Sequence, residues 1–330
     1  MLTGEIANVI GNTPLIYLKT LSQITGCHLW GKAEFLNPGG SIKDRAALGI
    51  IINAEKNNLL KPGMTIVEGT AGNTGIGLAT LAAQRGYHCH IVMPDNQSQE
   101  KYQTLNALGA KLTVVPPCPF SSENHFYHQA KKIAESNPQI YFWANQFENM
   151  ANSQFHYDHT GAEIWSQTKG KIDHFCCSTG TGGTLGGVSD FLKSKNSKIQ
   201  ITLLDPHGSG MHEYFQTQKI SSSGSSVTEG IGIMRLTANF LRAQIDHSLK
   251  IDDNQMISML YFLAQKEGLL VGTSAALNVY GAYQIAKNNK NKHLHIVTML
   301  CDSALRYQSK VFNKKWLEEK NLQAIIESIT

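Results

Sequence analysis

Residues 172–193 read IDHFCCSTGTGGTLGGVSDFLK, which is a mostly apolar run, a glycine-rich loop and an amphipathic segment in direct succession. The run at residues 172–177 is typical of a strand buried on both faces, as strands are in parallel sheets. The segment at residues 184–193 opens with threonine, which is preferred at helix N-termini. The stretch therefore predicts a strand, a loop and a crossover helix, the repeating unit of an α/β fold.

The same alternation continues on both sides of this unit. Crossover connections of this kind join neighbouring strands in parallel, so we expect an α/β fold with two open, twisted, mostly parallel sheets and flanking helices. The expected strands are residues 65–67, 88–93, 111–115, 172–177, 200–204, 269–271 and 295–301, and the expected helices are residues 75–85, 97–108, 184–193, 253–266 and 275–287.

Interruptions of the alternation predict the domain organisation. Polar residues 145–149 break the rhythm, so we place a smaller N-terminal α/β domain at residues 45–150 and a larger domain at residues 1–44 together with 151–330. The polar interval 216–232 is expected to be a surface loop. Because open α/β sheets bind ligands at the carboxyl ends of their strands, we expect the active site in the cleft between the domains.

The composition argues against several classes of function. The chain has 330 residues and a net charge of only +4 that is spread along the sequence, so we expect neither nucleic-acid nor membrane binding. No apolar run is long enough to cross a bilayer and residues 1–5 do not resemble a signal peptide, so we expect a cytoplasmic location. The six cysteines form no CxxC pair, and the run at residues 88–90, HCH, lacks further ligands, so we expect reduced thiols and no metal site.

The loop at residues 180–184, GTGGT, predicts a phosphate site. Its glycines allow close backbone approach, its threonine hydroxyls add donors, and the following helix N-terminus favours a dianion. A dinucleotide fingerprint would need glycine in place of Leu185, and a Walker loop would need a Gly-Lys-Ser/Thr ending. The alternative is a glycine-rich turn without a ligand.

Three further motifs offer complementary groups. Residues 70–75, TAGNTG, present amides and hydroxyls to a carboxylate, and residues 272–274, GTS, place a serine hydroxyl where it can bond to a ring nitrogen. Residues 37–45, NPGGSIKDR, set Lys43 after a glycine turn at the start of an apolar helix, where its amine can form a Schiff base. Each motif alone is also compatible with an ordinary helix cap.

Together these motifs resemble those of the fold-type II pyridoxal phosphate enzymes, and in particular the cysteine synthase and cystathionine β-synthase family. The resemblance runs from residues 10–15, IGNTPL, to about Lys310. It implies pyridoxal 5'-phosphate (PLP) as the cofactor, Lys43 as the catalytic Schiff-base lysine, and a smaller domain that is mobile. The other implied cofactor residues are Asn73 at the ring hydroxyl, Gly180, Thr181, Gly182, Gly183 and Thr184 at the phosphate, and Ser274 at the ring nitrogen, and the implied substrate residues are Thr70, Ala71, Gly72, Asn73, Thr74, Gln146 and Gly230.

The resemblance implies a β-replacement that forms L-cysteine from O-acetyl-L-serine and sulfide through an α-aminoacrylate, with Lys43 as anchor and proton carrier. Three alternatives stay open. These are a cystathionine β-synthase-type condensation of serine or O-acetylserine with homocysteine, a serine or threonine dehydratase, and a non-catalytic scaffold. The family also implies a homodimer and, less strongly, binding of a serine acetyltransferase C-terminal tail.

Three departures from the family pattern leave the substrates open. Ala71 stands where many cysteine synthases carry serine, Met150 replaces a usual proline, and Cys301-Asp302-Ser303 differs from the Pro-Ser ending that is typical near the ring. Such changes can reshape a pocket without altering its chemistry, and substrate choice depends on pocket shape. The donor is therefore O-acetylserine, O-phosphoserine or serine, and the acceptor is sulfide or homocysteine.

Overall fold

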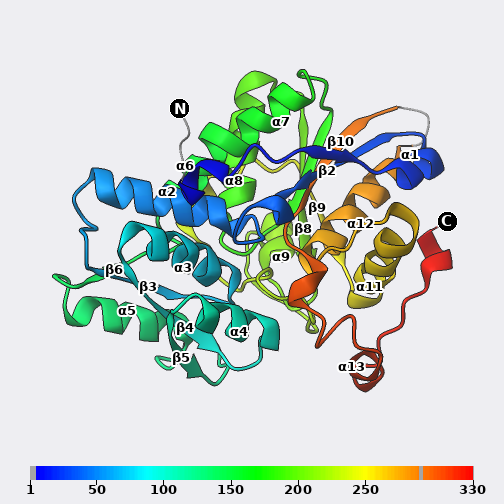
Figure 1. The fold of residues 1–330 in the computed structure, drawn as a ribbon. Coiled ribbons are helices and arrows are strands. Elements are labelled where there is room, and N and C mark those ends of the chain that lie inside the picture. Colours follow the sequence, from blue (N-terminus) through cyan, green and yellow to red (C-terminus); the bar gives the residue numbers. More distant parts are fainter. Residues whose placement is uncertain (1–4, 290–292, 330) are drawn as a thin grey trace.

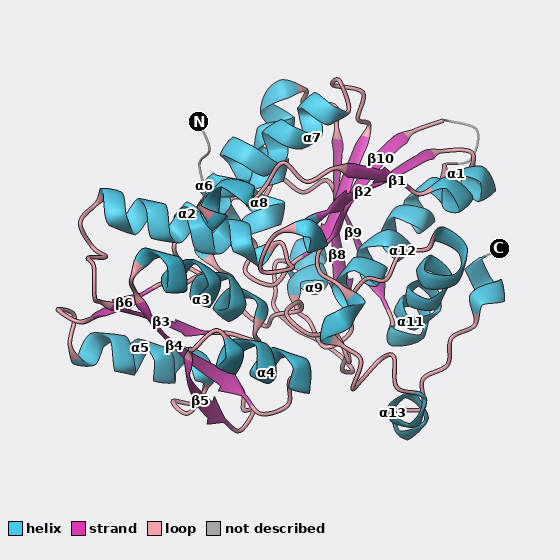
Figure 2. Ribbon diagram, in the orientation of Figure 1, coloured by secondary structure: helices cyan, strands magenta, loops and turns pink. Residues whose placement is uncertain are grey.

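The chain folds into two α/β bodies, each built around its own sheet (Figures 1 and 2). The computed structural model describes residues 5–289 and 293–329. In these residues the larger sheet has the strand order β1-β2-β10-β7-β8-β9, and β1 alone runs antiparallel to its neighbour. The smaller sheet has the order β5-β4-β3-β6 and is parallel throughout. The expected α/β class with two mostly parallel sheets is confirmed.

The elements have the following limits. The strands are β1 Leu15–Tyr17, β2 His28–Ala33, β3 Thr65–Gly69, β4 His88–Pro94, β5 Lys111–Val115, β6 Tyr141–Trp143, β7 His174–Ser178, β8 Gln200–Pro206, β9 His247–Ile251 and β10 His295–Leu300. The α-helices are α1 Lys19–Thr25, α2 Lys43–Lys56, α3 Asn73–Arg85, α4 Gln99–Ala107, α5 Phe126–Ser136, α6 Ala151–Phe155, α7 Ala162–Gln167, α8 Gly183–Lys195, α9 Met211–Thr217, α10 Ala238–Leu241, α11 Asp253–Phe262, α12 Thr273–Asn288 and α13 Lys314–Glu319.

One expected strand, residues 269–271, is wrong. Val271 forms an isolated bridge with Ser303, while the amide of Leu269 bonds back to the carbonyl of Leu263 and closes the helical turn that follows α11. Leu270 is 58% exposed. The short apolar run thus connects the helical turn after α11 to α12 instead of joining a sheet. Over three residues, the periodicity of apolar side chains cannot distinguish a strand from such a connection.

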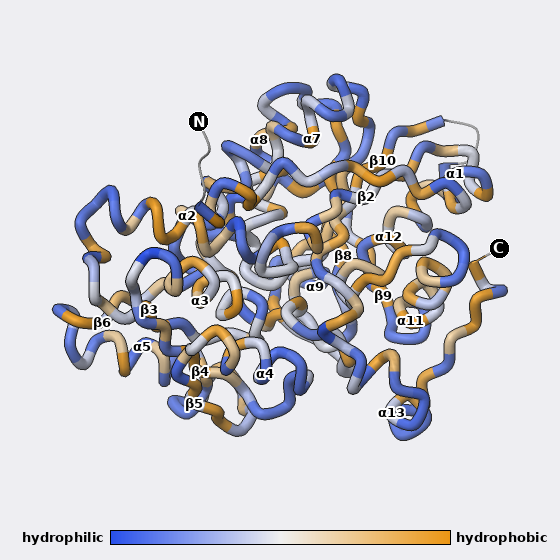
Figure 3. Tube along the Cα trace, viewed as in Figure 1, coloured by the Kyte–Doolittle hydropathy of each residue, from blue (hydrophilic) through white to orange (hydrophobic). Residues whose placement is uncertain are grey.

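The larger sheet is buried on both faces, which explains its apolar strands. On one face Cys176 and Leu204 pack with α11 and α12, and on the other face Phe175 and Leu203 pack with α8. The outer helix α13 is hydrophilic, in contrast to these interior segments (Figure 3). Successive strand residues face opposite sides, so both sides of β7 and β8 must be apolar.

Helix α2 links the two bodies. It packs against α3, which flanks the smaller sheet, and against α6. The four strands of the smaller sheet all lie between residues 65 and 143. The expected domain limits at residues 45 and 150 stay a prediction, because α2 itself begins at Lys43 and contacts elements on both sides of those limits.

A buried network of charges fixes the start of α2. Arg45 has no exposed surface, and its guanidinium donates to Glu34 and to both oxygens of Glu163, with distances of 2.7 Å. Lys32 on β2 also pairs with Glu163, at 2.6 Å. Burial would raise the pKa of Glu163, but Arg45 and Lys32 outweigh it and lower that pKa from 4.5 to about 2. The network holds α2 against β2 and α7. It does so at Arg45, which lies two residues after Lys43.

We expect Glu163→Gln to destabilise the fold by about 3 kcal/mol at neutral pH, because two buried cations lose a shared anionic partner. The contribution of Glu163 is fully present above its unfolded pKa of 4.5 and is lost as the pH falls toward 2. The stability difference between wild type and variant should therefore shrink from neutral pH to about pH 2.5, as measured by urea unfolding.

Glu135→Gln is the matched control for this substitution. Glu135 pairs with Lys131 at 3.7 Å, and both side chains are exposed. Exposed pairs contribute about 0–1 kcal/mol. Equal losses of stability in the two variants, or a difference that does not change with pH, would contradict the role of Glu163.

Candidate active site

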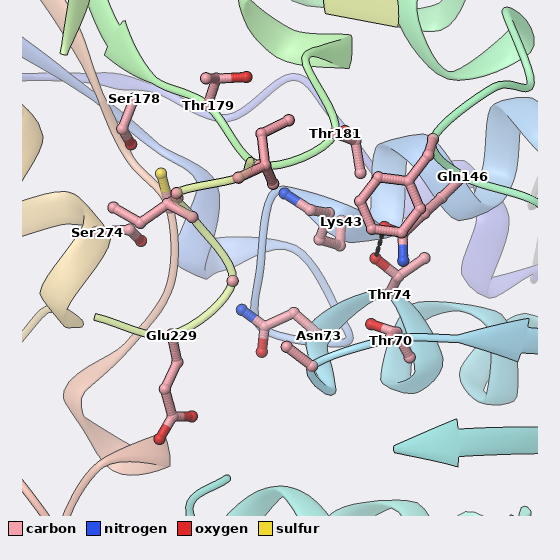
Figure 4. A pocket seen from close by; sticks show the side chains of 18 of the residues that line it. Lys43, Thr70, Asn73, Thr74, Gln146, Ser178, Thr179, Thr181, Glu229 and Ser274 are labelled. Carbon is pink, nitrogen blue, oxygen red and sulfur yellow. Dashed lines mark hydrogen bonds between the residues drawn. The ribbon is translucent and has the colours of Figure 1, made fainter. Parts of the chain in front are cut away.

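A cavity of about 290 Å³ lies at the carboxyl ends of strands from both sheets (Figure 4). Its wall is made by residues that end or follow β3, β4, β7 and β10 and by the first turns of α2, α3, α8 and α12. The predicted residues in this wall are Lys43, Thr70, Ala71, Asn73, Thr74, Gln146, Gly180, Thr181, Gly182, Thr184, Gly230 and Ser274. Gly72 and Gly183 are not part of the wall.

Lys43 is the first residue of α2 and is half-buried. The turn before it needs glycine, because Gly40 has a φ of +78°. The amide of Ile42 then bonds to the carbonyl of Cys301 at 2.9 Å, which fastens the turn to the end of β10. Within residues 5–289 and 293–329, no side-chain hydrogen bond or ion pair holds the Lys43 amine, and Figure 4 shows it directed into the cavity. An amine so placed is available to a carbonyl carbon.

The glycine-rich loop joins the end of β7 to the start of α8. The hydroxyls of Ser178 and Thr179 are buried and have no hydrogen-bond partner in the part of the chain that the structure describes. The hydroxyl of Thr181 accepts from Asn152 at 3.0 Å, and that of Thr184 lies 3.3 Å from His156 Nε2. Free hydroxyls and amides at a helix N-terminus form an anion site.

Close packing behind the loop explains its glycines. A Cβ on Gly180 would lie 2.3 Å from the carbonyl oxygen of Gly230, and one on Gly183 would lie 2.1 Å from Asn152 Oδ1. Gly182 has a φ of +86°, and a Cβ added there would collide with the backbone of Phe240. Protein contacts therefore require these glycines, and for Gly183, which does not line the cavity, the requirement is the close contact with Asn152.

A second loop joins β3 to α3. Thr74 donates to Gln146 Oε1 at 2.5 Å, and Gln146 Nε2 donates to Glu68 at 3.2 Å. Burial raises the pKa of Glu68 to about 8, against the hydrogen bonds from Gln146. Figure 4 shows Thr74 below Gln146, and Thr70 further below. Together with the N-terminus of α3, these groups place polar atoms where a carboxylate can bind.

The groups expected at a ring lie across the cavity. Ser274, in the first turn of α12, is 5% exposed and lines the wall. Asn73 begins α3, and its amide donates to Asp302 at 2.7 Å and accepts from Arg306. The structure therefore brings together every loop that the sequence singles out.

Several wall residues were missed by the sequence analysis. Ser178 and Thr179 directly precede the glycine-rich loop, and Glu229 directly precedes Gly230, so neighbouring motifs were the available signal. Glu229 is 8% exposed and lines the cavity, so the expectation of a surface loop at residues 216–232 fails at this residue, whereas residues 216–225 and Gly230 are exposed. The Glu229 carboxylate pairs with Lys101 and, at 2.5 Å, with Lys310.

These lysines set the ionisation of Glu229. Burial would raise its pKa, but Lys101 and Lys310 outweigh burial and lower it. Figure 4 shows the Glu229 carboxylate pointing away from Lys43. Lys101 lies on α4 of the smaller body and Glu229 on the loop after α9, so this buried ion pair joins the two sides of the cavity.

Comparison with known proteins identifies the class. The model of the family described as pyridoxal-phosphate dependent enzyme matches residues 6–302. The chain therefore belongs to the family of pyridoxal-phosphate dependent enzymes, and its cofactor is PLP. Within that family it groups with the cysteine synthases.

Two relatives are cysteine synthase 1 of Neurospora crassa and cysteine synthase 1 of Emericella nidulans, each 48% identical over 326 residues, which is 97% of this chain and 86% and 88% of theirs. Cystathionine beta-synthase of Apis mellifera is 39% identical over 98% of this chain and 64% of its own length. The crystal structure of O-ureido-L-serine synthase is 33% identical, with a TM-score of 0.86 over 95% of this chain and 96% of that chain.

The side chains present fit PLP. The unpartnered hydroxyls of Ser178 and Thr179 lie where a phosphate would accept from them, together with the amides of residues 180–184. Lys43 would hold the aldehyde carbon, Asn73 the ring hydroxyl and Ser274 the ring nitrogen. Thr70 and Thr74 are then left for the carboxylate of the substrate.

We expect Gly180→Ala to weaken PLP binding by about tenfold or more, because the new methyl group would push the phosphate loop away from the carbonyl of Gly230. Absorbance titration of the apoprotein with PLP measures the dissociation constant.

Gly109→Ala is the matched control. Gly109 has a positive φ, +75°, and nothing lies within 4 Å of its added Cβ, so this substitution changes the backbone conformation at a place without a close contact. We expect it to cost about 1 kcal/mol in stability while leaving the PLP affinity unchanged. Wild-type affinity in Gly180→Ala would show that the packing behind the loop does not shape the phosphate site.

Proposed function

We propose that the protein is a cysteine synthase that forms L-cysteine from O-acetyl-L-serine and sulfide by β-replacement. The observation that carries the proposal is a single cavity that contains a free lysine amine, an anion-binding glycine loop and a separate carboxylate-binding loop. Relatives named cysteine synthase, 42–48% identical over nearly the whole chain, support it.

PLP, when bound, draws electrons away from the α-carbon of an amino acid and so makes its proton removable. The residues of this chain then divide the remaining tasks. The Lys43 amine lies in the same cavity as the carboxylate loop, so it can remove the proton at the α-carbon and return it. Thr70, Thr74 and the α3 N-terminus hold the substrate carboxylate and so orient the α-carbon toward Lys43.

The walls of the cavity keep reactive groups away from water. The ion pair of Glu229 with Lys101 joins the two bodies, and Lys310 of the larger body pairs with the same carboxylate. If the acceptor is sulfide, the nucleophile that has to enter the cavity is small. Exclusion of water protects an activated substrate from hydrolysis.

Condensation with homocysteine is the second candidate. Ala71 lines the cavity within the carboxylate loop, and a relative 39% identical to this chain is named cystathionine beta-synthase. The first candidate is preferred because the relatives of higher identity are named cysteine synthases. For the dehydratase and for the non-catalytic scaffold we find no supporting observation.

The assembly and location of the protein are further proposals. We infer a homodimer, a cytoplasmic location and, more distantly, recognition of a serine acetyltransferase C-terminal tail from the family resemblance. One relative, 39% identical, is named a putative mitochondrial cysteine synthase. Among the described residues, no helix combines the length and the apolar character needed to cross a membrane.

We expect turnover of O-acetylserine with sulfide to exceed that of serine with homocysteine by at least about tenfold in kcat/KM, since the donor and acceptor pocket discriminates at the transition state. Side-by-side assays of both pairs, with O-phosphoserine as a third donor, measure this. The Lys43→Ala variant supplies the background rate. Faster cystathionine formation would overturn the cysteine synthase proposal and favour the second candidate.

A further inference from the structure

Both polar atoms of the Asn73 amide are held by the segment at residues 301–307. Its nitrogen donates to Asp302 Oδ2 at 2.7 Å, and its oxygen accepts from the Arg306 guanidinium. The reversed amide would set its carbonyl against a carboxylate and its NH₂ group against a cation. These contacts therefore leave Asn73 one orientation.

This orientation leaves one donor free. An amide NH₂ group has two hydrogens, and Asp302 takes one of them. Figure 4 shows the Asn73 nitrogen on the side of Lys43 and Ser274, and its oxygen on the opposite side. The second hydrogen is thus available on the cavity side, where a phenolate oxygen beside the aldehyde would accept it.

The two anchors are themselves fixed. Asp302 has no exposed surface and accepts from the hydroxyl of Tyr307 at 2.6 Å. Its Oδ1 would lie 2.1 Å from a Cβ on Gly272, so the carboxylate is packed against the turn that leads to Ser274. Arg306 is 9% exposed and also donates to the carbonyl of Gly39, in the turn that leads to Lys43.

We propose that Asp302 and Arg306 are positioning residues that hold the Asn73 amide in the orientation that donates to the ring hydroxyl oxygen of PLP. The inference rests on the cofactor assignment and goes beyond it, because neither residue lines the cavity. The same segment contacts the turns before Lys43 and before Ser274, so it joins the three loops that surround the ring.

A double-mutant cycle tests this proposal. The variants are Asn73→Ala, Asp302→Ala and the double substitution, and the readouts are the PLP dissociation constant and the visible absorption maximum of the bound cofactor. We expect Asp302→Ala to weaken binding by about tenfold and to shift the maximum in the direction that Asn73→Ala shifts it. In the Asn73→Ala background, we expect Asp302→Ala to change the affinity by less than about twofold.

A residue that only supports the fold would lower the affinity equally in both backgrounds, and that result would overturn the proposal. A second cycle uses Arg306→Met in place of Asp302→Ala. It tests the proposal even if the Asp302→Ala variant does not fold. Asp302→Asn keeps an acceptor for Asn73 and should lose only about threefold. Leu305→Ala is the matched control, because Leu305 lies on the same segment and is 71% exposed.

Two kinds of failure are distinguishable. If the wild-type protein takes up no PLP, the cofactor assignment is wrong. If it binds PLP, but the Asp302 and Arg306 variants match it in affinity and absorption, the cofactor assignment stands and the positioning role is wrong.

Discussion

The burial of the Arg45 guanidinium is the constraint on which the active site depends. A cation without exposed surface is stable only beside anions, and Glu34 and Glu163 supply them from β2's end and from α7. These partners belong to elements of the larger body, whereas the far face of α2 packs on α3 of the smaller one. The first turn of α2, and Lys43 with it, is therefore held in place while the helix bridges the bodies.

The parallel strands supply the rest of the geometry. The loop after β3 lies at the carboxyl edge of the smaller sheet and the loop after β7 at that of the larger sheet, and both deliver a helix N-terminus to the cavity that the two edges share. Each N-terminus presents amides and partial positive charge that can bind an anion, which supports our proposal that the substrate carboxylate and the cofactor phosphate bind at separate loops. Lys43 lies in the wall of the same cavity, so one amine can serve in both of the roles that we propose for it, anchor and proton carrier.

Local patterns were enough to predict β3, β4, β5, β7, β8 and β10, the helices α3, α4, α8, α11 and α12, and most of the loops that form the wall, whereas β1, β2, β6 and β9 were not predicted. Residues such as Gly180 and Thr74 lie in short motifs whose composition carries the signal. Partners distant in sequence could not be predicted in this way, because Asp302 meets Asn73 across 229 positions and Lys101 meets Glu229 across 128. Such contacts exist only after the bodies pack. The strand expected at residues 269–271 is wrong for a different reason, since three apolar residues are too few to distinguish a strand from a loop, and Leu270 is in fact exposed.

The central claim is that Lys43 holds the cofactor, and chemical trapping tests it most directly. Lys101 is a real competitor, because it also lines the cavity. Its amine, however, is engaged by Glu229. Borohydride reduction of the PLP-loaded protein, followed by digestion and mass mapping, should place the pyridoxyl group on the peptide that contains Lys43. A label on the Lys101 peptide, or no stable label, would contradict the account.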